Sequence, residues 1–226
     1  MIKSPILLTG IERSGTTIVA RILQSCRVWH GNCSVMMENK PIRQLMDYYY
    51  ISQQADPNGQ YPLVATNHDM PVPDNWRNDI EESLMVQGYV RGNWFLKSSR
   101  LIHIWPLMNK AYPDAKWLIV RRRSGDIIES CMKTGFMKAY KNSKIREQIG
   151  IVDEREAWAW WIHQHENQLV EMIKAGLNVK VIWPDRMIEG DYAQMAETLD
   201  WLGLRWNEKI VPIVEDQLIK GRTNKR

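Results

Sequence analysis

The segment LTGIERSGTTIVARIL, which spans residues 8–23, constrains the fold of this chain more than any other stretch. It follows an apolar run, carries glycines at positions 10 and 15, and continues with the apolar spacing of a helix. A glycine turn between a buried strand and a helix directs several backbone N–H groups at one point, where the helix dipole adds positive potential. The segment therefore predicts an anion-binding loop at Gly10–Thr17, and a plain glycine turn is the alternative.

The basic residues near this loop indicate which anion it holds. Thr16 stands where a magnesium–ATP loop would place a lysine, and Arg13 is the basic residue of the loop instead. An ATP site also needs an Asp at a neighbouring strand end to hold magnesium, but the apolar run KWLIV ends in Arg121–Arg123. Guanidinium groups bind phosphate through paired hydrogen bonds and do not bind cations. We therefore predict two anion sites at one sheet edge, bridged by a nucleoside with a phosphate at each end.

Apolar runs alternate with helical patterns along the rest of the chain. This order predicts an α/β fold, a three-layer α/β/α sandwich around a mainly parallel sheet. No repeat, low-complexity tract or linker interrupts it, so one domain is expected over residues 1–226. The expected strands are residues 5–10, 61–66, 93–99, 115–122 and 178–184.

Composition narrows the class of protein further. A net charge of +4 with scattered Lys and Arg suits an anionic ligand and argues against nucleic-acid binding. The three cysteines form no CxxC motif, which is typical of a reducing compartment. No apolar stretch approaches the ~20 residues of a membrane-spanning helix. We therefore expect a cytoplasmic protein without a membrane span.

Two short motifs resemble those of the sulfotransferase family, whose donor is 3'-phosphoadenosine 5'-phosphosulfate. The first motif is RSGTT, at residues 13–17. In that family this loop cradles the 5'-phosphosulfate of the donor. The resemblance implies that Arg13 contacts the phosphate bridge and the transferring sulfuryl group. It also implies that the donor phosphate is held by Ser14, Gly15, Thr16 and Thr17.

The second motif of the resemblance lies more than 100 residues downstream. Arg122 ends a predicted strand, Asp126 follows four residues later and Ser130 eight residues later, and this spacing matches the family's 3'-phosphate site. Lys97, in FLKSS, is similar to a strand lysine near the family's reaction centre. The resemblance implies a core like that of P-loop nucleoside-triphosphate hydrolases, and metal-independent, in-line sulfuryl transfer to a hydroxyl or amine. Adenosine 3',5'-bisphosphate would be the product.

The chain departs from its cytosolic relatives at two positions of the site. Ile18 replaces the aromatic residue that stacks on adenine, and Ser99 replaces the catalytic histidine. Glu38 is the first candidate base, because relatives with an Arg in the loop use a Glu from this region. A plain helix-start carboxylate is the alternative reading of Glu38. His68 is the second candidate, and an ordinary loop histidine is its alternative reading.

Two other functions remain open from the sequence. A small-molecule kinase would need a carboxylate that binds magnesium, and Asp69 is the candidate for it. A non-catalytic nucleotide-binding protein of the same fold is the other. The acceptor is expected to be a small molecule, a glycan or a lipid. A sugar, a lipid head group, a phenol and a peptide tyrosine all fit equally well.

Overall fold

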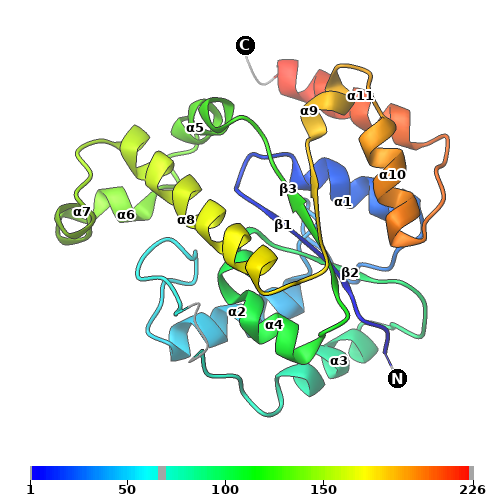
Figure 1. Cartoon of the computed structure of the whole chain (residues 1–226), viewed down its shortest axis with the longest axis horizontal. Coiled ribbons are helices and arrows are strands. Elements are labelled where there is room, and N and C mark those ends of the chain that lie inside the picture. The colour runs from blue at the N-terminus through cyan, green and yellow to red at the C-terminus, as the bar shows by residue number, and fades with distance from the viewer. Residues whose placement is uncertain (1, 66–69, 224–226) are drawn as a thin grey trace.

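The computed structural model describes residues 2–65 and 70–223, and its centre is a four-stranded parallel sheet (Figure 1). The strand order is β2-β1-β3-β4, and all three pairings are parallel. The strands are β1 (Ile6–Gly10), β2 (Phe95–Lys97), β3 (Lys116–Val120) and β4 (Val179–Ile182). This arrangement confirms the expected α/β class with a parallel central sheet.

The strands are apolar along their whole length because helices cover both faces of the sheet. In β3, Trp117 and Ile119 belong to the core cluster on one face, and Leu118 and Val120 belong to the cluster on the other. All four side chains are at most 2% exposed. The alternation of a strand thus divides one apolar run between two cores.

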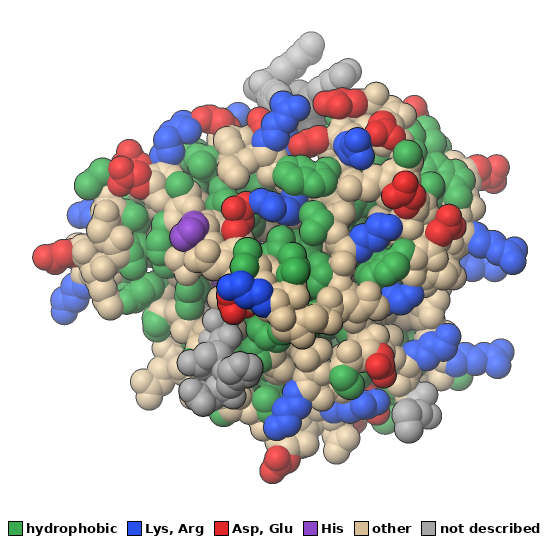
Figure 2. Space-filling view, viewed as in Figure 1, with side chains coloured by type: hydrophobic (Ala, Val, Ile, Leu, Met, Phe, Trp, Pro, Cys, Tyr) green, Lys and Arg blue, Asp and Glu red, His purple; other side chains and the backbone are tan. Residues whose placement is uncertain are grey.

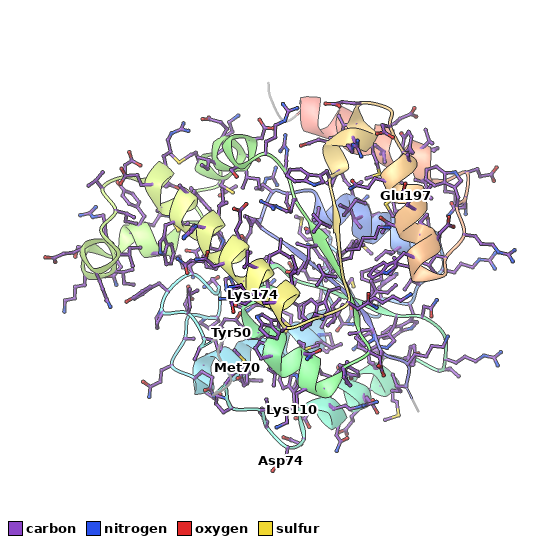
Figure 3. The ribbon with its side chains drawn as sticks, viewed as in Figure 1. Tyr50, Met70, Asp74, Lys110, Lys174 and Glu197 are labelled. Carbon is purple, nitrogen blue, oxygen red and sulfur yellow. The ribbon has the colours of Figure 1, made fainter. Side chains whose placement is uncertain are left out.

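The helices form two outer layers and a lateral group (Figure 1). One face is covered by α1 (Thr16–Ser25), α9 (Pro184–Ile188), α10 (Ala193–Leu202) and α11 (Ile210–Thr223). The other face is covered by α2 (Lys40–Ser52), α3 (Trp76–Val86), the 3-10 helix η1 (Ser99–Ile104), α4 (Trp105–Ala111) and the C-terminal half of α8 (Glu154–Lys174). The third core joins α8 to α5 (Ser124–Met132), α6 (Lys138–Lys141) and α7 (Ser143–Ile149). Tyr50 and Met70 belong to the core cluster on the face that α2, α3, η1 and α4 cover, and they lie in the lower half of the view in Figure 3.

The register of the parallel strands brings their carboxyl ends to one edge of the sheet. Leu8 pairs with Lys97, Gly10 pairs with Val120, and Val120 pairs with Ile182. The segments that follow the four strands therefore start side by side. In an open parallel sheet this edge is where ligands bind, at the point where chain connections diverge to the two sides.

The expected strand at residues 61–66 is wrong over its described part. Residues 61–65 form irregular chain, although Val64 is only 3% exposed and packs into the core. An apolar side chain can be buried by a loop that has no strand partner, so the short apolar run was misread.

In the part of the chain that the structure describes, no helix is long and apolar enough to span a membrane. Lys and Arg side chains are spread over the face shown in Figure 2.

Two histidines are buried against each other beneath the sheet edge. The ring centroids of His103 and His165 are 4.5 Å apart, and both rings pack on Trp161. Nδ1–H of His165 donates a hydrogen bond of 3.0 Å to the Trp161 carbonyl. Burial lowers the pKa of His103 well below its usual value of 6.5, and it lowers the pKa of His165 as well. Both rings are therefore neutral in the folded protein at neutral pH.

We predict that this pair makes the protein sensitive to acid. Below pH 6.5 the unfolded chain takes up protons at these rings while the folded chain does not, so stability falls as the pH falls. Each histidine contributes a slope of up to about 1.4 kcal/mol per pH unit. Urea unfolding between pH 7.5 and about 5 measures it, and His103→Leu should flatten the slope. An equal slope in wild type and variant would assign acid sensitivity to other groups.

Candidate functional site

Two glycines give the loop at the end of β1 its shape. Gly10 has φ 155°, and a Cβ there would lie 2.4 Å from the Val120 carbonyl oxygen. Gly15 has φ 99° and is the N-cap of α1, and a Cβ there would lie 3.1 Å from Pro184. The loop thus runs tightly between the end of β3 and the start of α9, and only glycine fits both positions without strain.

The start of α1 has the features of an anion-binding site. Thr16 and Thr17 are its first two residues, no acidic side chain lies in its first turn, and no side chain caps it. Ser14 is 1% exposed, and its hydroxyl has no hydrogen-bond partner among the described residues. Free N–H groups at a helix start and an unpaired buried hydroxyl fit a phosphate or sulfate group. These features fit the predicted phosphate loop, and phosphate binding there stays a prediction.

Arg13 connects the two predicted motifs. Its Nε donates a hydrogen bond of 2.9 Å to the Ser130 hydroxyl, across 117 residues of sequence. Arg13 has φ 68°, a left-handed conformation that is uncommon for a residue with a side chain. Such conformations concentrate at functional sites, where the surroundings hold them in place. The hydrogen bond brings the loop of β1 and helix α5 together at one edge of the sheet.

Arg122 lies between two carboxylates. Its Nε is 3.3 Å from Oδ1 of Asp185 and 4.0 Å from Oδ2 of Asp126. Asp126 is part of the predicted motif, whereas Asp185, the second residue of α9, was not expected from the sequence. Neighbouring Arg121 turns to Glu166 on α8 and stacks over the ring of Trp183, 5.3 Å from its centroid.

Lys97 and Glu38, both predicted catalytic residues, lie next to each other. The Lys97 ammonium donates to the Met36 carbonyl at 2.8 Å and lies 3.5 Å from the Glu38 carboxylate, which also pairs with Arg43 at 3.2 Å. Lys97 is only 5% exposed, and burial lowers its pKa. The negative charges of Glu38 and Glu12 oppose that shift. The pair forms a second charged group at the same sheet edge, because Lys97 ends β2.

Glu12, inside the loop, is a residue that the sequence analysis passed over. It accepts hydrogen bonds from the Ser99 hydroxyl at 2.6 Å and from the Trp161 indole N–H at 2.9 Å. The carboxylate thereby ties the loop to the turn after β2 and to α8. The sequence did contain a signal for the role of Glu12. A single acidic residue in a predicted anion-binding loop repels the anion unless its charge is paired, so it needs partners outside the loop. Ser99, which the resemblance placed at the position of a catalytic histidine, is one of those partners.

Two predicted residues are not placed. His68, the second candidate base, and Asp69, the carboxylate that a kinase would need, lie outside the described residues. Within the described ranges, 2–65 and 70–223, no group of three or more His, Cys, Asp or Glu side chains forms a metal site.

Comparison with known proteins shows the family to which the chain belongs. The sequence profile described as "Sulfotransferase family" matches residues 5–208, so the chain belongs to the sulfotransferase family. Among solved structures, the fold is similar to that of the sulfotransferase STF9 from Mycobacterium avium, with a TM-score of 0.57 and 14% sequence identity. That similarity covers 97% of this chain and 69% of the other. A search of curated proteins gave no significant match. Membership of this family supports transferase activity for the protein.

We predict that removing the Glu12 carboxylate loosens the loop. Glu12→Ala leaves the Trp161 N–H buried without its acceptor, and we expect a loss of about 1–3 kcal/mol of unfolding free energy. Trp161→Phe keeps most of the ring and removes the same hydrogen bond. In a double-mutant cycle measured by urea unfolding, the two losses should be clearly less than additive. Fully additive losses would mean that this hydrogen bond does not hold the loop.

Proposed function

We propose that this protein transfers a sulfuryl group from 3'-phosphoadenosine 5'-phosphosulfate to a hydroxyl or amine of an acceptor. The observation that carries the proposal is the hydrogen bond between Arg13 and Ser130. It joins two motifs that the sequence suggested separately, one for each phosphate end of the donor. Membership of the sulfotransferase family supports the same activity.

Each end of the donor has its own residues in this proposal. The 5'-phosphosulfate is bound by the start of α1, with Ser14, Gly15, Thr16 and Thr17 as donors. The 3'-phosphate is bound by Arg122 and Ser130 at the end of β3 and on α5. Trp183, whose ring lies at the end of β4 and is partly exposed, is the aromatic residue available at this edge to stack on adenine.

The proposed reaction is an in-line displacement at sulfur. The acceptor oxygen forms a bond to sulfur while the bond from sulfur to the bridging oxygen breaks, and adenosine 3',5'-bisphosphate leaves. Arg13 and Lys97 stabilise the negative charge that develops on the bridging and equatorial oxygens. Glu38 takes the proton of the acceptor hydroxyl. The contact between Glu38 and Lys97 supports this assignment, because it places a proton acceptor beside a charge-stabilising group.

We predict that adenosine 3',5'-bisphosphate binds without added metal. At 100 times its dissociation constant a ligand stabilises the fold by about 2.7 kcal/mol, which a thermal-shift titration detects. ATP with magnesium, tested in parallel, should stabilise the protein far less, because β3 is followed by Arg121–Arg123 and not by the Asp that would hold magnesium. Stronger stabilisation by ATP with magnesium would favour a kinase and contradict the assignment of Arg122 and Ser130.

We predict that Arg13 matters more for turnover than for binding. Arg13→Ala should lower kcat by about 10²–10³-fold, because one preorganised donor to the developing charge is lost. Affinity for the bisphosphate, which lacks the sulfuryl group, should change only a few-fold. Turnover is measured as bisphosphate release, with the fastest acceptor from a panel of phenols, sugars and lipid head groups. Arg123→Ala, an exposed arginine at the same strand end, is the control.

We also predict that kcat falls at alkaline pH because Lys97 loses its proton. Its ammonium is lost as the pH rises through its pKa, which burial has lowered from the usual 10.5, so kcat should fall as the pH rises, at a lower pH than for an ordinary lysine. Lys97→Arg keeps the charge at all accessible pH values and should remove this fall, although at a lower rate. A pH–rate profile of both proteins tests this. An unchanged fall in the variant would assign the titration to another group.

A further inference from the structure

Pro184 and Asp185 span the distance between the two anion sites. Pro184 touches the 5'-phosphate loop, where a Cβ on Gly15 would lie 3.1 Å from its ring. Asp185, the next residue, lies 3.3 Å from the guanidinium of Arg122. Two consecutive residues of one backbone segment therefore contact both ends of the proposed donor site.

In the proposed binding mode, the ribose of the donor lies along this segment. Its 5'-oxygen leads to the phosphate at the start of α1, and its 3'-oxygen carries the phosphate at Arg122. The part of the ligand that joins them is the sugar, so the residues that join the two sites border it. The sugar has one free hydroxyl, at the 2' carbon, next to the phosphate on the 3' carbon.

Asp185 has the chemistry to recognise that hydroxyl. A carboxylate is a strong hydrogen-bond acceptor, and carboxylates read ribose hydroxyls in other nucleotide sites. The Asp185 side chain is 23% exposed, so it is partly open to a ligand. The Arg122 Nε next to it is buried and makes no well-directed hydrogen bond within the described residues. The contact between the two side chains is thus a charge pairing that leaves acceptor capacity on the carboxylate.

We propose that Asp185 determines sugar specificity by accepting a hydrogen bond from the ribose 2'-hydroxyl and by repelling a phosphate at that position. This inference rests on the proposed function, because it places the 3'-phosphate on Arg122. The carboxylate selects donors with a 3'-phosphate and a free 2'-hydroxyl over 2'-deoxy and 2'-phosphate isomers. Arg122 alone does not make this distinction, since a guanidinium binds either phosphate.

Asp126 provides a matched control for the charge of Asp185. It is also a carboxylate close to Arg122, at 4.0 Å, and its removal changes the local charge by the same amount. It projects from the first turn of α5, whereas Asp185 follows Pro184, the residue that touches the loop after β1. A general charge effect on phosphate affinity should therefore appear in both variants, and a contact with the sugar only in Asp185→Ala.

The test is calorimetric binding of three ligands to the full chain. They are adenosine 3',5'-bisphosphate, its 2'-deoxy analogue and adenosine 2',5'-bisphosphate. In the wild-type protein we expect the 2'-deoxy analogue to bind about tenfold more weakly than the ribose compound, the loss of one hydrogen bond to a charged group. The 2',5' isomer should bind more weakly still. In Asp185→Ala the tenfold ratio should fall to about one, whereas in Asp126→Ala it should persist.

A second variant keeps the test independent of folding. Asp185→Asn preserves the shape and an acceptor oxygen but removes the charge, so it should keep part of the 2'-hydroxyl preference and bind the 2',5' isomer better than wild type does. Ratios unchanged from wild type in both Asp185 variants would overturn the proposal, as would an equal collapse in Asp126→Ala. If the wild-type protein binds none of the three ligands, the proposed function itself fails, and the inference fails with it.

Discussion

The close approach of Gly10 to the end of β3 is the constraint on which the site depends. With a Cβ only 2.4 Å from the Val120 carbonyl, any other residue would force the two central strands apart where they must lie in register. Register in turn decides which side chains meet, because Gly10, Lys97, Val120 and Ile182 end their strands at one edge. The loop after β1, the ammonium of Lys97 and the Arg122 guanidinium thus share an edge as a consequence of parallel pairing.

Charge at this edge is balanced more closely than an anion site alone requires. Glu12 lies in the phosphate loop, Asp185 lies beside Arg122, and Glu38 lies beside Lys97. Each carboxylate lowers the positive potential available to a donor with several negative charges, which costs affinity. In return, each fixes a side chain or a loop in one geometry before the ligand arrives. The balance suits the proposed reaction, in which a bisphosphate product is released after every turnover.

Much of this architecture could be predicted from the sequence. The runs PILLTG and KWLIV became β1 and β3 almost residue for residue, because a strand buried on both faces is apolar throughout. Residues 61–65 were misread as a strand, since burial of Val64 by a loop leaves the same local signature. The two motifs were recognisable by their resemblance to those of the sulfotransferase family. The roles of Glu12 and Asp185 could not be recognised from the sequence. The partners of Glu12 lie 87 and 149 residues away, and the partner of Asp185 lies at the end of a neighbouring strand.

The sequence by itself determined the class of fold, and it predicted the anion loop and the residue types at each end of the proposed donor. These properties are local, because they depend on apolar periodicity, glycine positions and the spacing of a few polar residues. Only the tertiary structure decided which side chains face each other: Arg13 with Ser130, Lys97 with Glu38, and Arg122 with Asp185. Those pairs are set by strand order and register, which bring distant segments to one edge, and no short stretch of sequence contains that information.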